Sequence, residues 1–148
     1  MVDLNSSQSL SDAIELMYFA YRGFTSRADK VLEGRGLGRV HHRILYFIGR
    51  NPNFTIGQLI ETLAVSKQAL NAPLRQLVEM NLVSQNADMN DRRIKRLLLT
   101  ASGQRLETSL TGTQMAQLKN AFEAVEPKHV EVWYQVMKAL SNPVVKNR

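Results

Sequence analysis

Four side chains with hydrogen-bonding or cationic ends share one face of the segment from residue 66 to residue 80. Lys67, Gln68, Asn71 and Arg75 fall within about 100° when residues are placed at 100° intervals around a helix. Gln and Asn bond bidentately to adenine, Arg pairs with guanine, and Lys suits guanine or phosphate. This face predicts contact with base edges in duplex DNA, although a surface helix with no partner also shows a polar face.

A cluster of cations follows a short distance along the chain. Its members are Arg92, Arg93, Lys95 and Arg96. If they belong to a hairpin, alternate residues point to opposite faces, so Arg93 and Lys95 share one side. Arginine at such a tip enters the minor groove, where narrow A·T tracts deepen the negative potential. We expect Asp91 to brace this loop, because a carboxylate facing phosphate is repelled.

Two short helices and a hairpin must position these groups. Thr55 and Gln58 have the spacing of a capping box and begin the first helix. Ser66 caps the second helix, which closes at Asn81 because asparagine tolerates the left-handed conformation. Strands over residues 82–86 and 95–99 complete a helix-turn-helix with a wing, which gives one element for the groove and one for the backbone. Thr55 and Ser66, at the two helix starts, join the predicted DNA-binding residues.

Pro73 lies in the middle of the predicted recognition helix. It removes the amide that would bond the carbonyl of Ala69, at a cost of about 3 kcal/mol in a regular helix interior. The sequence therefore predicts that this helix is either kinked at Pro73 or divided into two pieces.

Longer helices flank this module. Apolar residues alternate at spacings of four and three over residues 10–31, which predicts a long helix capped by Ser9 or Ser11. A glycine-rich segment, 34–38, ends it, and another helix occupies about 39–50. Two more helices follow Thr100, and the last should end at Asn142-Pro143.

Three of the predicted helices, the first, fifth and sixth, each carry an apolar stripe. The sequence shows no second hydrophobic core in which these stripes would be buried. Pairing with a second copy of the chain would bury them, whereas the alternative is packing on the module of the same chain. We therefore expect a homodimer.

The charge distribution agrees with a module that faces a polyanion. The 148-residue chain has 19 Lys+Arg and 13 Asp+Glu, a formal charge of +6, and a pI near 9.9. Residues 34–106 hold 11 basic and 4 acidic residues, whereas the remainder holds 8 and 9. A basic middle between near-neutral ends favours nucleic acid as the partner, although a solvated basic surface is the alternative.

Several classes of protein are excluded or not expected. The chain has no cysteine, which excludes disulfides, thiolate zinc sites and thiol redox chemistry. His41, His42 and His129 lack metal-ligand spacing, and the glycines do not form a nucleotide-binding loop. We expect no enzyme, metal or cofactor. No apolar run approaches the roughly 20 residues of a membrane span, and no signal peptide is evident, so a cytoplasmic location is expected.

The segment 88–103, DMNDRRIKRLLLTASG, resembles the wing of MarR-type (multiple antibiotic resistance regulator) repressors. Asp91, Arg93, Leu99, Thr100 and Gly103 match the family pattern of Asp-x-Arg followed by Leu-Thr-x-x-Gly. The resemblance implies a homodimeric winged-helix transcription factor whose DNA affinity is modulated by small molecules. Asn81 stands where the family usually has glycine, and Pro73 is unusual in a recognition helix.

The same resemblance suggests an effector cleft beside the DNA-binding lobe. The candidate residues are Tyr18, Tyr21, His41, Tyr46 and Phe47. Aromatic walls with a few polar tips suit an aromatic or lipophilic molecule, while the alternative is that these residues are core and dimer-interface residues.

The sequence thus predicts one mainly α domain over 1–148 with a small β-hairpin. A winged helix-turn-helix lobe occupies 39–100, and dimerisation helices occupy 9–33 and 101–141. The predicted function is a transcriptional regulator, acting as a ligand-responsive repressor that binds a pseudo-palindromic operator as a homodimer. The alternative is a winged-helix interaction scaffold without DNA binding.

Overall fold

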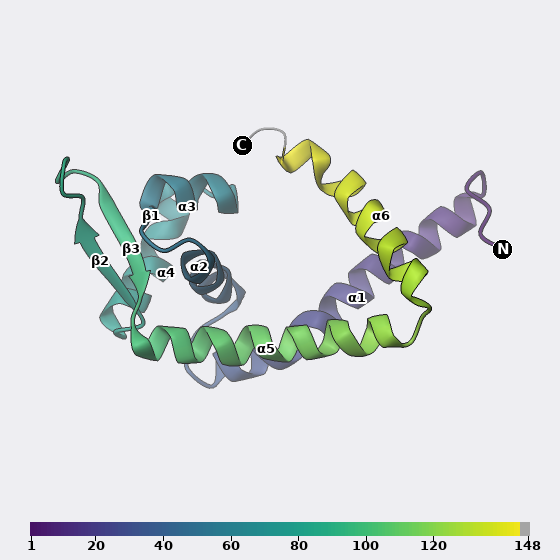
Figure 1. Cartoon of the computed structure of the whole chain (residues 1–148), viewed down its shortest axis with the longest axis horizontal. Helices are drawn as coiled ribbons and strands as arrows, with labels where there is room; N and C mark the ends of the chain where they lie inside the picture. The colour runs from purple at the N-terminus through teal and green to yellow at the C-terminus, as the bar shows by residue number, and fades with distance from the viewer. Residues whose placement is uncertain (146–148) are drawn as a thin grey trace.

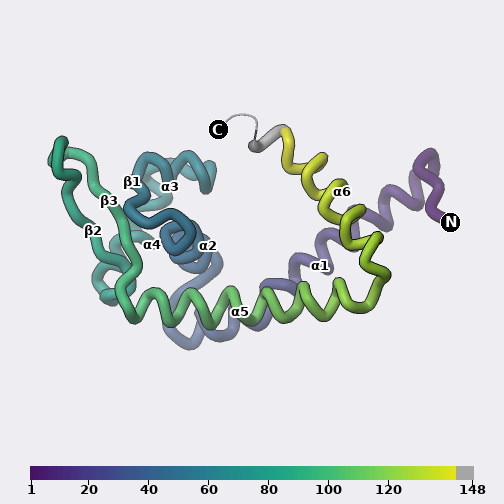
Figure 2. Tube along the Cα trace, in the orientation of Figure 1, coloured from purple at the N-terminus to yellow at the C-terminus, as the bar shows by residue number. Residues whose placement is uncertain are grey.

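The computed structural model describes residues 1–145, with side chains described through residue 142. Its elements follow the chain in the order α1 (Ser7–Glu33), α2 (Arg39–Arg50), β1 (Phe54–Thr55), α3 (Ile56–Leu63), α4 (Lys67–Glu79), β2 (Val83–Ala87), β3 (Lys95–Leu99), α5 (Ala101–Glu123) and α6 (Pro127–Val145). Figure 1 shows two parts: a lobe built from α2 to β3, and an arm formed by α6 and much of α1, with α5 running from one part to the other. The tube in Figure 2 shows the lobe and the arm rising at opposite ends of α5.

The lobe contains a three-stranded antiparallel sheet in the order β1-β3-β2. In β2 and β3, Val83 pairs with Leu99 and Ala87 with Lys95, so the predicted hairpin is present with β2 shifted by one residue. The sequence did not predict β1, which pairs Phe54 with Leu97. A two-residue strand is too short to show the alternation that identifies strands.

The core of the lobe lies between α2, α3, α4 and the sheet. Ile44, Leu45 and Ile48 of α2 are buried in one apolar cluster with residues of α3, α4 and β3. On α4, the predicted inner residues Leu70, Leu74 and Leu77 are buried. The opposite face of α4 is therefore directed away from the core.

Most of the predicted helix starts are confirmed by hydrogen bonds. The Ser66 hydroxyl accepts from the Ala69 amide at 3.0 Å, and Thr55 and Gln58 form a reciprocal capping box. Asn81 closes α4 with φ 58°, in the left-handed region that the sequence predicted. The cap of α1 was predicted wrongly, since Ser6, not Ser9 or Ser11, accepts from the Ser9 amide. This helix begins one turn before its apolar stripe, and its several nearby serines are equivalent as caps.

Of the two alternatives predicted at Pro73, the division is excluded and the kink stays a prediction, whereas the predicted end of α6 was wrong. Helix α4 is a single element over Lys67–Glu79 with Pro73 inside it, so it is not divided into two pieces. Pro73 leaves one carbonyl, that of Ala69, without its amide partner, and Ala69 is exposed, where water can satisfy it. Helix α6 does not end at Asn142-Pro143 but continues to Val145. Proline removes one amide but holds φ near the helical value, so the backbone can continue in helical conformation for two more residues.

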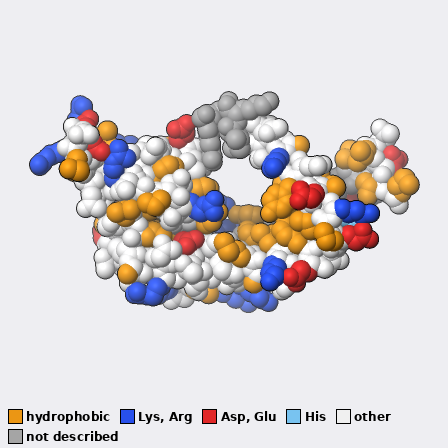
Figure 3. All heavy atoms as spheres, viewed as in Figure 1, with side chains coloured by type: hydrophobic (Ala, Val, Ile, Leu, Met, Phe, Trp, Pro, Cys, Tyr) orange, Lys and Arg blue, Asp and Glu red, His pale blue; other side chains and the backbone are white. Residues whose placement is uncertain are grey.

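The arm leaves much apolar surface uncovered within one chain. Helix α5 packs on α1 and on α2, and α6 contacts the far end of α5. Apolar side chains gather where α1, α5 and α6 meet, on the right of Figure 3.

Within residues 1–145, no helix is both long enough and apolar enough to cross a membrane.

Candidate nucleic-acid interface

The outer face of α4 carries the four predicted base-reading residues. Lys67, Gln68, Asn71 and Arg75 are all exposed. None of these side chains forms a hydrogen bond or ion pair with the rest of the described chain. Ser66 is also exposed, but its hydroxyl accepts from the Ala69 amide and so anchors the start of the helix. The face thus presents free donors and acceptors on a capped helix.

Thr55 has a structural role at the start of α3. Its hydroxyl accepts from the Gln58 amide at 3.0 Å, while its own amide donates to Gln58 Oε1 at 2.9 Å. The hydroxyl proton is not used by this capping box. Thr55 therefore remains capable of donating to a phosphate while holding the helix end.

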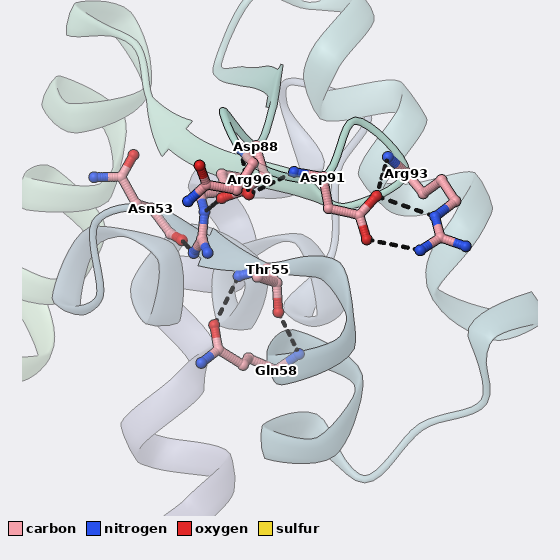
Figure 4. A network of polar contacts seen from close by, with 8 residues as sticks. Asn53, Thr55, Gln58, Asp88, Asp91, Arg93 and Arg96 are labelled. Atoms are coloured by element: carbon pink, nitrogen blue, oxygen red, sulfur yellow. Dashed lines mark hydrogen bonds and ion pairs between the residues drawn. The ribbon is translucent and has the colours of Figure 1, made fainter.

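In the wing, Asp91 braces Arg93 (Figure 4). Arg93 donates from Nε and Nη2 to the two carboxylate oxygens, each at 3.0 Å, and from its backbone amide at 3.1 Å. These hydrogen bonds hold the pKa of Asp91 below its usual value. The Arg93 side chain is still 91% exposed. Asp91 therefore orients the cation without covering it, as the sequence predicted.

Arg93 lies in the turn before β3, which begins at Lys95. The alternation of side chains along a strand therefore does not apply to Arg93. The predicted shared face of Arg93 and Lys95, which assumed that both lie in a strand, does not follow. Arg92 and Lys95 are exposed and have no partner within the described residues. The wing thus offers two free cations and one oriented cation.

Arg96 differs from the free cation that the sequence predicted. Its Nε donates to Asp88, and its Nη1 donates to the Asn53 carbonyl at 3.0 Å (Figure 4). The Arg96 hydrogen bond, with the Asn90 and Asp91 amides, holds the pKa of Asp88 below its usual value. Arg96 therefore ties the wing to the turn before β1. This link depends on β1, so the sequence pattern gave no signal for it.

A cavity of about 410 Å³ lies between α1, α2 and α5. Among the predicted ligand residues, Tyr21, Tyr46 and Phe47 line it, whereas Tyr18 and His41 do not. Tyr18 lies almost one turn before Tyr21 and packs against Phe19. His41 is turned toward α4, and its neighbour His42 lines the cavity instead, because adjacent helical residues differ by about 100° in direction.

The cavity has apolar walls and a cationic side. Arg43 donates to the Tyr21 hydroxyl, and Arg39 donates to Asp29 at 2.9 Å and lies over the Tyr21 ring, 5.2 Å from its centroid. Phe24, Tyr46 and Phe47 contribute aromatic surface. Within the described residues Asp29 pairs with Arg39, whereas Arg43 has no carboxylate partner, so the Arg43 guanidinium beside these aromatic rings suits an anionic aromatic molecule.

A buried polar chain lies behind His42. The Thr111 hydroxyl donates to Glu107 at 2.7 Å, so it accepts from His42 Nε2, which is 3.3 Å away. Burial lowers the pKa of His42, an effect partly offset by the negative charge of Glu107. His42 is thus kept neutral at this junction of α2 and α5.

Within the described residues, no group of three or more His, Asp or Glu side chains could hold a metal ion.

Comparisons with known proteins agree with this geometry. A MarR family model matches residues 35–94, which cover α2 to the wing. The HTH-type transcriptional regulator PetP of Rhodobacter capsulatus is 38% identical over 141 residues, covering 95% of this chain and 85% of that protein. The chain belongs to the MarR family of transcriptional regulators. The resemblance seen in the wing is thereby confirmed.

Solved structures confirm the winged-helix fold over nearly the whole chain. Streptococcus pneumoniae FabT, solved in complex with DNA, has a TM-score of 0.83 at 15% identity, with 94% of this chain and 99% of that chain covered. A MarR protein from Peptoclostridium difficile has a TM-score of 0.75 at 16% identity, with 100% and 97% covered. The long flanking helices are therefore part of the shared fold.

Proposed function

We propose that this MarR-family protein is a homodimeric repressor that binds a pseudo-palindromic operator and releases it when a small anionic aromatic molecule binds. The observation that carries the DNA-binding part is the outer face of α4, where four polar side chains have no partner within the described chain. This face stands beside a wing with free and oriented cations. The whole chain acts as one domain, with the lobe at 39–100 and the dimerisation helices at 9–33 and 101–141, in the cytoplasm.

Each part of the interface has a distinct task. Gln68 and Asn71 lie near the start of α4, the part of a recognition helix that meets base edges. Their amides bond adenine, and Arg75 bonds guanine. Arg92, Arg93 and Lys95 neutralise phosphate or enter the minor groove, so they contribute affinity that depends on salt more than on sequence.

The dimer is supported by the apolar surface of the arm. Exposed apolar side chains occur on the arm and on the adjoining α5: Leu10, Ile14, Met17 and Tyr21 on α1, Met115 on α5, and Trp133, Met137 and Leu140 on α6. Apolar surface of this extent is unusual on a monomer. A two-fold pairing through α1, α5 and α6 buries it and presents two α4 helices to one duplex.

The ligand response is supported by the position of the cavity. Its walls come from α1 and α5, which belong to the arm or reach it, and from α2, which belongs to the lobe. A ligand that fits better when the two lobes are at a different spacing shifts the population toward that spacing. Moving the equilibrium from 1:99 to 99:1 requires a preference of about 5.5 kcal/mol for the form that cannot bind DNA.

The first test is binding to random-sequence duplex at several salt concentrations, with sedimentation of the free protein. We expect a dimer whose affinity falls steeply with salt, as release of counterions from phosphates requires. A monomer contradicts the dimer. Failure to bind duplex even at low salt would favour the alternative, an interaction scaffold, whose main support is Pro73 inside the recognition helix.

A further inference from the structure

The side chain of Gln76, on α4, is held at both ends by groups outside that helix. Its Oε1 lies 2.8 Å from Nε2 of His41 on α2, and its Nε2 donates to the Gly36 carbonyl at 3.2 Å. Gly36 has φ 73° in the loop between α1 and α2, a conformation that glycine adopts without strain. The amide of Gln76 therefore joins α4 to two places 35 and 40 residues away in sequence.

The direction of every hydrogen bond in this link is determined. The Gly38 amide donates to Nδ1 of His41 at 2.9 Å, so this nitrogen carries no proton. Nε2 of His41 therefore carries the proton and donates to Gln76 Oε1. The amide group of Gln76 is then left to donate to Gly36, an acceptor. All donors meet acceptors, so neutral His41 and one orientation of the Gln76 amide satisfy the whole chain.

Besides this link, α2 and α4 share an apolar core. Ile44 and Leu45 of α2 and Leu74 and Leu77 of α4 belong to the same buried cluster. Apolar packing is non-directional, so it holds helices together without specifying rotation as strictly as hydrogen bonds do. Gln76 follows Arg75 directly in sequence. Arg75 is exposed, whereas Gln76 is partly buried. A fixed Gln76 amide therefore fixes the rotation of the exposed face.

We propose that Gln76, through His41, is a positioning residue for DNA recognition. It contacts no base and sets the rotation of α4, which determines where Gln68, Asn71 and Arg75 point. The inference rests on the proposed role of α4 as the recognition helix. Loss of the link reduces the preference for operator over random duplex more than it reduces binding to random duplex, because phosphate contacts tolerate a small rotation and bidentate base contacts do not.

Two single variants break the link from opposite ends. Gln76→Leu removes both hydrogen bonds with little change in volume. His41→Asn keeps an oxygen near the position of Nδ1 to accept from the Gly38 amide, but it is too short to reach Gln76. Each variant should lower the ratio of operator to random-duplex affinity by about fivefold, the range expected for loss of one or two net hydrogen bonds in a coupled network.

The double variant, His41→Asn with Gln76→Leu, should lose no more than either single variant, because both remove the same link. Gln8→Leu, an exposed change that precedes the dimerisation helix at 9–33, is the matched control and should leave the ratio unchanged. The operator is the duplex enriched by wild-type protein from a random pool. Full additivity in the double variant, or an unchanged ratio in both single variants, overturns the proposal.

A measurement on free protein separates this proposal from the proposed function. Nitrogen NMR should show His41 protonated on Nε2 and not on Nδ1, and both variants should speed amide exchange in α4 by about fivefold while leaving α5 unchanged. If wild-type protein binds no duplex, the proposed function fails, yet these measurements still test the link. The opposite tautomer, or unchanged exchange in α4 for the variant that folds, overturns it.

Discussion

Gly103→Ala should destabilise the junction between the wing and α5. A Cβ added at Gly103 would lie 1.9 Å from the Leu82 carbonyl oxygen and 2.9 Å from its carbonyl carbon. Both are backbone atoms, so no side chain can rotate to make room. The same carbonyl accepts from the Thr100 amide at 3.1 Å, and the Thr100 hydroxyl caps Gly103 at 3.0 Å. The methyl group must therefore separate the start of β2 from the first turn of α5.

The expected loss follows from three terms. Overpacking at a well-packed site costs about 1–3 kcal/mol. Loss of the bond from Thr100 to Leu82 costs about 1 kcal/mol more. Alanine in a helix gains about 0.5–1 kcal/mol over glycine, which offsets part of this cost. The net decrease in the free energy of unfolding is therefore about 1–3.5 kcal/mol. Gly112→Ala, also on α5, meets no atom within 4 Å and should be neutral or gain up to about 1 kcal/mol.

The assay is urea unfolding followed by circular dichroism, at one protein concentration because a dimer's stability depends on it. Gly103→Ala should be less stable than wild type by about 1–3.5 kcal/mol, whereas Gly112→Ala should match wild type or exceed it by up to about 1 kcal/mol. Equal stability of Gly103→Ala and Gly112→Ala would refute the close approach. Because Gly103 supports the wing base, its variant should also bind DNA more weakly under conditions where it remains folded.

Three further results are expected. Gln68→Ala or Asn71→Ala should cost about 1–3 kcal/mol per half-site on operator and spare random duplex, whereas Arg93→Ala should weaken both and make the salt dependence shallower in binding titrations. Burial lowers the pKa of His42, so His42 binds protons more readily in the unfolded chain than in the folded one. The free energy of unfolding should therefore fall as pH drops below about 6.5. Urea titrations at several pH values should show a weaker pH dependence of this free energy for His42→Gln. Millimolar salicylate should weaken operator binding, and Arg43→Ala should reduce this effect; no shift with any of a panel of aromatic acids would leave the cavity without an effector role.

The helices and the hairpin could be predicted from sequence because their signals are local. Thr55, Ser66 and Thr100 each cap a helix through a bond three residues away, and the polar and apolar faces of α4 follow from the helical repeat. Asn81 was also predictable, since few residues other than glycine tolerate its φ of 58°.

The parts that were missed depend on contacts between distant residues. Strand β1 exists because Phe54 meets Leu97 across the sheet, and Arg96 is tied to Asn53 only because that strand is there. His41 and His42 are neighbours in sequence, yet one bonds α4 and the other lines the cavity. Composition and periodicity do not distinguish two adjacent histidines whose partners lie 35 and 69 residues away.

Selection of bound sequences from a random duplex pool tests the central claim most directly. A two-fold dimer that presents α4 to the major groove should enrich inverted repeats whose half-sites have centres about 10 base pairs apart. The Asn71→Ala variant should lose the preference at the base that this residue reads while keeping the dyad. Enrichment of sequences with no dyad, or no enrichment by a protein that otherwise binds duplex, would contradict the account.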